Sequence, residues 1–107
     1  IYMILTTTNS IDGKEVTNYL GIIVGTTYTS NHGTKGMSLK DIFNSKKYYA
    51  NYETGLDEAK EEAFEKLKVQ AEEKQANAII GVSIDIEMMS TTGVTMISVV
   101  GTAVRVQ

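Results

Sequence analysis

The fold is decided by residues 56–71, which read LDEAKEEAFEKLKVQA. Their apolar side chains recur every three or four residues, at Leu56, Ala59, Ala63, Leu67 and Ala71. This spacing is typical of an α-helix with one buried face, and the opposite face carries acidic and basic residues. We predict an amphipathic helix of about 22 residues. It begins after a capping sequence at Thr54 and ends at Asn77, which provides a left-handed cap.

The residues after this helix predict a β-hairpin. Residues 78–89 and 94–106 are rich in β-branched residues, and a polar turn at 90–93 separates them. If Met89 pairs with Val94, a period of two places apolar residues on the face toward the helix. The expected members of that face are Ile80, Val82, Ile84, Ile86 and Met88, with Ile97 opposite Ile86 and Val99 opposite Ile84.

The residues before the helix predict a second hairpin. Residues 3–8 and 16–29 have strand patterns, and the dipeptide Asp12-Gly13 between them is a strong turn signal. Gly21 and Gly25 interrupt the longer strand, which indicates a bulge, a bend or the close approach of another backbone. Further along, we expect a polar loop at 30–36, one or two helical turns at 38–43 and an irregular surface at 44–51.

Together these patterns predict one α+β domain over residues 3–107. The expected order is β-β-α-β-β, in which an antiparallel sheet of two hairpins is covered on one face by one long helix. We take Met3 as the natural start of the chain, and Ile1 and Tyr2 as residues left over from cloning.

The face of the sheet that the helix leaves uncovered predicts self-association. One helix can cover only one face of a four-stranded sheet, and the last strand is apolar or small on both faces. Another copy of the chain is the expected cover for the second face. In the alternative interpretation, Ser, Thr and Gly make this face polar enough to stay in contact with water. Its expected members are Met96, Ser98, Val100, Thr102 and Val104, beside Asp85 and Glu87.

The composition excludes several classes of protein. The absence of cysteine excludes disulfides, thiolate catalysis and thiolate metal ligands. A net charge of −3 argues against nucleic-acid binding. No apolar run approaches the ~20 residues of a membrane helix, and no signal peptide is recognisable. We therefore expect a soluble, cytoplasmic protein that binds neither nucleic acid nor membrane.

The sequence offers little support for catalysis. His32 is the only histidine, and no Gly-x-Ser-x-Gly elbow is present, so we predict that the protein is not an enzyme. Residues 33–36 lack the spacing of a phosphate-binding loop and are interpreted as an ordinary loop. Tyr48, Tyr49 and Tyr52 beside Lys46 and Lys47 are interpreted as a packing cluster rather than a base-stacking patch.

Four stretches, taken in order, resemble the YbjQ family of small bacterial proteins. They are Thr6-Thr7 with Gly13 and Tyr19; Leu56-x-x-Ala59, Ala63-x-x-x-Leu67 and Ala71; Ala76-Asn77-Ala78-Ile79-Ile80-Gly81-Val82 with Asp85; and Val100-Gly101-Thr102-Ala103-Val104. The resemblance covers the chain except for the segment after Thr29, which is more polar than the family's. A second departure is Gln75, where the family usually has glycine before Ala-Asn-Ala.

The resemblance implies a β-β-α-β-β domain whose subunits close into a cyclic ring, usually a pentamer, with short extra strands joining neighbours. Two stacked rings would give a decamer. It also implies that the biochemical function is not established, although the family carries a heavy-metal-binding label.

A ring would bring copies of one residue around a common axis, which makes His32 or the pair Asp85 and Glu87 a candidate metal site. Asp85 and Glu87 are two residues apart on a strand and share a face. Carboxylates suit a hard divalent cation better than a heavy metal. We therefore predict a homo-oligomeric module that binds a divalent metal ion or small ligand at a shared site. The alternative is a structural or protein-interaction module without a small ligand.

Overall fold

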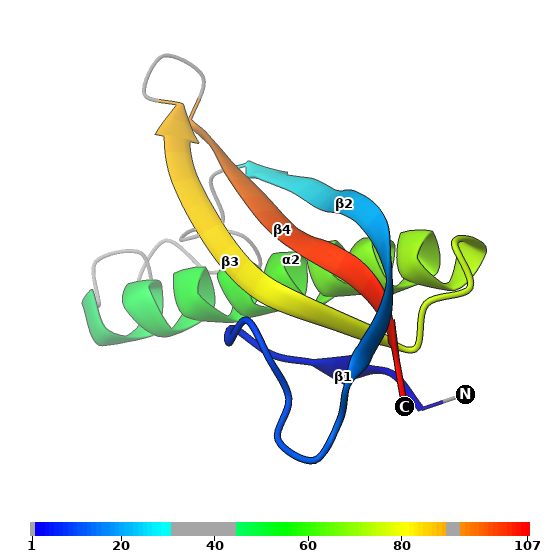
Figure 1. The fold of residues 1–107 in the computed structure, drawn as a ribbon. Helices are drawn as coiled ribbons and strands as arrows, with labels where there is room; N and C mark the ends of the chain where they lie inside the picture. Colours follow the sequence, from blue (N-terminus) through cyan, green and yellow to red (C-terminus); the bar gives the residue numbers. More distant parts are fainter. Residues whose placement is uncertain (1, 31–44, 90–92) are drawn as a thin grey trace.

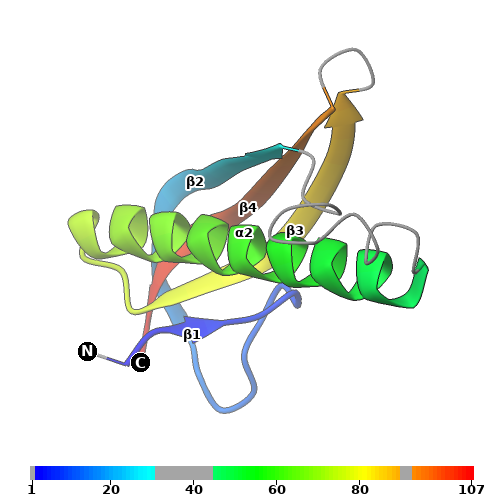
Figure 2. The same cartoon turned by 180° about the vertical axis from the view of Figure 1, so that it is seen from behind.

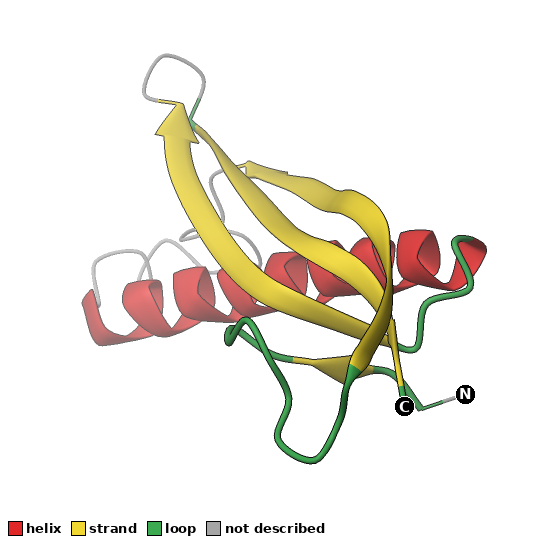
Figure 3. Ribbon diagram, viewed as in Figure 1, coloured by secondary structure: helices red, strands yellow, loops and turns green. Residues whose placement is uncertain are grey.

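The described residues of the protein fold into a mixed sheet crossed by a long helix (Figures 1 and 3). The structure, a computed structural model, describes residues 2–30, 45–89 and 93–107. Its elements are β1 (Ile4–Leu5), β2 (Val16–Ser30), α2 (Ser45–Glu73), β3 (Ala78–Met89) and β4 (Val94–Val106). The α+β class and the β-β-α-β-β order agree with the sequence-based prediction. Figure 2 shows α2 in front of the sheet.

The predicted N-terminal hairpin is wrong, because β1 and β2 do not pair with each other. The strand order is β1-β3-β4-β2. The two residues of β1 run parallel to the start of β3, whereas β2 runs antiparallel to β4 along nearly its whole length. Asp12-Gly13 does form a turn, with Gly13 at φ 76°, but this turn carries the chain across the end of the sheet. The 15-residue β2 gains far more from pairing with the 13-residue β4 than it could from β1.

The C-terminal hairpin is confirmed in its register. Met89 pairs with Val94, and the predicted pairs Ile86–Ile97 and Ile84–Val99 are both present.

The expected period of two along β3 is interrupted by a bulge. The register shifts between Ile80 and Ser83, and Gly81 within the shift has φ 60°, a conformation that glycine adopts without steric cost. Because of the extra residue, Ile80 and Val82 lie on opposite faces. Val82 packs beneath the helix, while Ile80 joins a second apolar cluster on the other face, so the prediction that Ile80 faces the helix is wrong.

Helix α2 starts earlier than predicted. Residues 45–51, expected to be irregular, form its first turns, and Thr54-Gly55 lies inside the helix rather than before it. One interior glycine costs about 1 kcal/mol relative to alanine, which is too little to end a helix that packs on a sheet. The helical turns predicted at 38–43 lie outside the described residues.

The left-handed residue at the end of α2 is Gln75 (φ 64°), not Asn77. The Ala76 N–H donates to the Ala71 carbonyl oxygen at 2.9 Å and the Gln75 N–H to that of Glu72 at 2.9 Å, which is the Schellman pattern. Asn77 instead pairs with Val106 through its side-chain amide: Nδ2 donates to the Val106 carbonyl oxygen at 2.9 Å, and Oδ1 accepts from the Val106 N–H at 2.8 Å.

Small residues let α2 approach β2 very closely. A Cβ atom added to Gly25 would overlap the Ala63 carbonyl oxygen and lie 3.0 Å from the Leu67 nitrogen. Next to it, the buried Thr27 hydroxyl donates to the Ala59 carbonyl oxygen at 2.8 Å. The close approach of another backbone at Gly25 is therefore confirmed. The predicted helix face is buried beneath this contact, at Ala59, Ala63, Leu67 and Ala71.

The helix covers only part of its own side of the sheet. It packs on β2 and β4, so the outer strand β3 extends beyond it (Figure 2). Ile84 and Ile86 point to the predicted face, yet they are 44% and 47% exposed.

We predict that Gly25→Ala destabilises the protein by about 1–3 kcal/mol, the usual cost of inserting a methyl group into a packed interface. Urea denaturation would measure the loss as a lower midpoint at unchanged slope. Val69→Ala is the control, because Val69 lies on α2, the other partner in this contact, and is half exposed. A Gly25→Ala protein as stable as this control would contradict the close docking.

We predict the opposite effect for Gln75→Gly, with a gain of about 0.5–1 kcal/mol. Glycine relieves the left-handed strain, estimated at roughly 1–2 kcal/mol, and part of that relief is offset by the entropy of its unfolded state. Thermal unfolding should show a higher midpoint for Gln75→Gly and a lower one for the β-branched Gln75→Val. The reverse order would show that Gln75 is not the left-handed cap.

Candidate functional site

The uncovered face of the sheet carries side chains from three strands, and we call it the open face. The registers align them in rows across β3, β4 and β2. The second row from the β3–β4 turn holds Glu87, Met96 and Tyr28, and the next row is polar, with Asp85, Ser98 and Thr26. The two remaining rows are Ser83, Val100 and Val24, followed by Thr102 and Ile22.

Much of the open face is apolar and accessible to solvent. Ile22 is 75% exposed and Tyr28 63%, while Val24 and Val100 are more than a third exposed. These residues come from neighbouring strands, so they form one continuous surface rather than scattered exposed side chains. The predicted uncovered face is therefore present within the described chain.

The chain itself covers the other end of this face. Val104, which we expected to be uncovered, is fully buried with Ala78, Ile80 and Val106. Ile4 of β1, Ile11 of the loop between β1 and β2, and Val16 at the start of β2 pack against them. The N-terminal segment thus forms a second, smaller core, and only the part of the face nearer the β3–β4 turn is open.

Asp85 and Glu87 lie side by side on the open face, as their spacing predicted. Both are exposed, and their neighbours across the ladder are Ser98 and Met96. Met88 is on the opposite face of β3 and does not join them.

Within one subunit, the described residues hold no group of three or more His, Cys, Asp or Glu side chains able to bind a metal ion. Calcium takes about 6–8 oxygen ligands, so Asp85 and Glu87 alone form an incomplete site. The third predicted ligand, His32, lies outside the described residues, as do residues 33–36. Residues 46–52 with their tyrosines are helical, but their side chains are not described.

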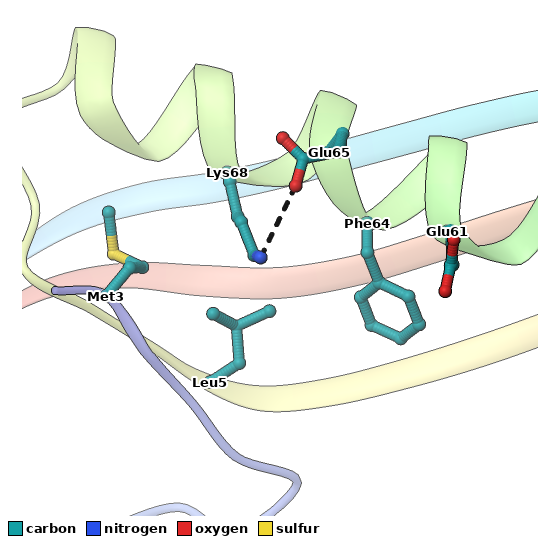
Figure 4. Close-up of a pocket in the computed structure, with 6 residues that line it drawn as sticks. All are labelled: Met3, Leu5, Glu61, Phe64, Glu65 and Lys68. Carbon is teal, nitrogen blue, oxygen red and sulfur yellow. Dashed lines mark hydrogen bonds and ion pairs between the residues drawn. The ribbon is translucent and has the colours of Figure 1, made fainter.

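A groove that the sequence did not predict lies between β1 and α2 (Figure 4). It has a volume of about 570 Å³ and an apolar floor of Met3, Leu5 and Phe64. Charged residues form its rim, where the Lys68 ammonium lies 3.4 Å from a Glu65 carboxylate oxygen, with Glu61 nearby. These side chains include no serine, cysteine or histidine. The groove exists because β1 pairs with β3, a contact that local sequence patterns do not reveal.

Side chains from α2 occupy some of the backbone groups at the free edge of β2. The Gln70 amide donates to the Val24 carbonyl oxygen at 2.5 Å and accepts from the Val24 N–H at 3.2 Å. The Lys66 ammonium donates to the Thr26 carbonyl oxygen at 2.9 Å. These contacts satisfy backbone groups that would otherwise bond to another strand.

The described part of the chain contains no helix long and apolar enough to cross a membrane.

Comparison with known proteins places the chain among proteins without an assigned activity. A family described as "Putative heavy-metal-binding", YbjQ, matches residues 3–107. UPF0145 proteins from Bacillus cereus and from Bacillus thuringiensis subsp. konkukian are each 37% identical over 106 residues, which is 97% of this chain and 100% of theirs.

A solved structure shares the fold. It is the crystal structure of a protein of unknown function from Pediococcus pentosaceus, assigned to the DUF74 family, with a TM-score of 0.61, 20% sequence identity and 98% of each chain covered. The match over residues 3–107, together with the full-length similarity to UPF0145 proteins, shows that this chain belongs to the YbjQ family.

Proposed function

We propose that the protein is a non-enzymatic binding module of the cytoplasm that works as a homo-oligomeric ring of five or ten subunits. In this proposal, copies of the chain cover one another's open faces and bring several Asp85–Glu87 pairs together. The shared site binds a divalent metal ion or a small ligand. The observation that carries the proposal is the position of two exposed carboxylates at the margin of an exposed apolar face.

The exposed side chains support self-association on energetic grounds. Burial of apolar surface contributes roughly 25 cal/mol for each Å² removed from water. Ile22, Val24, Tyr28 and Val100 supply that surface in one continuous patch. The helix and the N-terminal segment already cover the residues of the two cores, whereas the open face offers apolar surface that a further subunit would bury.

The ligand chemistry favours a hard cation over a heavy metal. The chain has no cysteine and a single histidine, whereas soft metals prefer thiolate and imidazole ligands. Carboxylate oxygens from Asp85 and Glu87 suit calcium or magnesium. The family's description as heavy-metal-binding therefore supports metal binding in general more than it supports a particular soft ion.

A second candidate function is a structural or protein-interaction module without a small ligand. Two observations favour it. The described residues of one subunit do not form a complete metal site, and the exposed apolar surface is extensive.

Native mass spectrometry of untagged protein, purified without chelator or a nickel column, tests the two candidates together. The binding module predicts a multiple of the 11.7 kDa chain mass that carries a reproducible additional mass. Replacing Asp85 and Glu87 with alanine should remove the additional mass, while the same loss of charge at Glu72 and Glu73 on α2 should not. A ring without additional mass would support the interaction module, and a monomer would contradict both.

We further predict that Ile22→Asp dissociates the oligomer, because a charge buried at the subunit contact would have no partner. Sedimentation velocity should show a shift to smaller species. Val69→Asp is the matched control, since Val69 is also an exposed apolar residue but lies on α2. If both variants keep the parent's mass, the open face is not the subunit contact.

A further inference from the structure

The groove between β1 and α2 is built on fixed parts of the fold. β1 is held against β3, where the Thr6 N–H donates to the Ile79 carbonyl oxygen at 3.0 Å. Met3 and Leu5 of this segment and Phe64 of α2 are half-buried and pack against the main core. The groove is therefore already formed in the single chain. Its volume of about 570 Å³ lies within the range of roughly 300–1,000 Å³ that small-molecule sites have.

The groove lies on the opposite side of the sheet from the open face. Ile4 alternates with Met3 and Leu5 along the chain, so its side chain points to the other side of the sheet. There it packs with Ile80 and Val104 in the second core, at the end of the open face that the chain itself covers. A ligand in the groove and a subunit on the open face would therefore occupy different surfaces.

The rim of the groove carries two carboxylates and one ammonium group. Glu61 and Glu65 are four residues apart on α2, a spacing at which like charges repel each other. The Lys68 ammonium pairs with Glu65 at 3.4 Å, whereas Glu61 has no hydrogen-bonding or ion-pair partner among the described residues. One negative charge at the rim is left without a partner, which favours a cationic ligand over an anionic one.

This carboxylate lies close to the aromatic part of the floor. Glu61 and Phe64 are three residues apart on the helix and line the same groove. Figure 4 shows the Phe64 ring between the side chains of Leu5 and Glu61. The face of an aromatic ring attracts a ligand cation, and the thioether of Met3 makes favourable contacts with aromatic rings. The groove thus offers an apolar floor suited to an aromatic body and a negative end suited to an ammonium group.

We propose that the groove between β1 and α2 binds a small aromatic amine. The aromatic body lies on Met3 and Leu5, and the ammonium group lies at the Phe64 end, beside the Glu61 carboxylate. Binding is by apolar burial, cation–π attraction and charge, and no bond is made or broken. The inference goes beyond the proposed function, because it uses other residues on the other side of the sheet and does not depend on the shared metal site.

Three probes that share an indole ring test the choice of charge. Tryptamine carries an ammonium group, tryptophol a hydroxyl and indole-3-propionate a carboxylate. The chain contains no tryptophan, so the indole fluorescence comes from the probe alone and its anisotropy reports binding to the full-length protein. Tryptamine should bind saturably, about threefold or more tightly than tryptophol and about tenfold or more tightly than indole-3-propionate.

The protein variants separate charge from apolar contact. Glu61→Gln keeps the shape of the side chain and should remove most of the preference for tryptamine, while tryptophol binding stays unchanged. Glu73→Gln is the matched control, because Glu73 is also an exposed glutamate of α2 but lies about 18 Å further along the helix. Circular dichroism confirms that each variant is folded.

Methionine methyl groups report where tryptamine binds. In protein labelled with carbon-13 at these methyl groups, the NMR signal of Met3 should shift on titration with tryptamine, because the indole ring lies against it. The signals of Met88 and Met96, which lie near the far end of the sheet, should stay in place. The Met3→Leu variant identifies the Met3 signal by its loss.

Four results would overturn the proposal. They are absence of saturable tryptamine binding, equal affinity for the three probes, an unchanged preference in Glu61→Gln, and tryptamine binding that leaves the Met3 signal in place. Native mass spectrometry of the protein without tryptamine reports the subunit number and any metal separately, so failure of this proposal is distinguishable from failure of the proposed function.

Discussion

The close seating of α2 on β2 is the contact on which the rest of the structure depends. Gly25 has no side chain, so the helix backbone at Ala63 lies directly above it. Thr27 on one side and Gln70 on the other then hydrogen-bond across the same contact. These interactions hold the helix over β2 and β4, while Ile84, Ile86 and Met88 near the far end of β3 stay exposed on the helix side. They also occupy backbone groups of Val24 and Thr26 at the β2 edge, while the open face stays available for partners.

The parts of the fold that could be predicted from the sequence are those controlled by local periodicity. The buried helix face follows from residues spaced three and four apart, and the β3–β4 register follows from a period of two and a short turn. The close approach of the helix backbone at Gly25 could also be predicted, because a glycine inside a strand indicates a position that another backbone approaches closely. The side-by-side placement of Asp85 and Glu87 follows from the same period.

The remaining features depend on contacts between distant residues. Two-residue β1 joins β3 in parallel, and no local pattern indicates which strand a short segment will choose. The groove between β1 and α2 depends on that choice. Thr54-Gly55 lies inside α2 because packing of the helix on the sheet outweighs the local preference of these two residues for a helix start. The left-handed conformation of Gln75 could not be predicted, because glycine or asparagine normally occupies such a position. No sequence pattern indicates the hydrogen bonds between Gln70 and Val24.

The central claim is that another copy of the chain covers the open face. Hydroxyl-radical footprinting with mass spectrometry tests it most directly, because the reagent labels accessible tyrosines in the intact protein. Tyr28 is 63% exposed and Tyr2 83% exposed in the single chain, so the two should react similarly in a monomer. The account predicts that Tyr28 is protected at concentrations where the protein is assembled and becomes reactive on dilution, while Tyr2 reacts throughout. Equal labelling of Tyr28 and Tyr2 at every concentration would contradict the account.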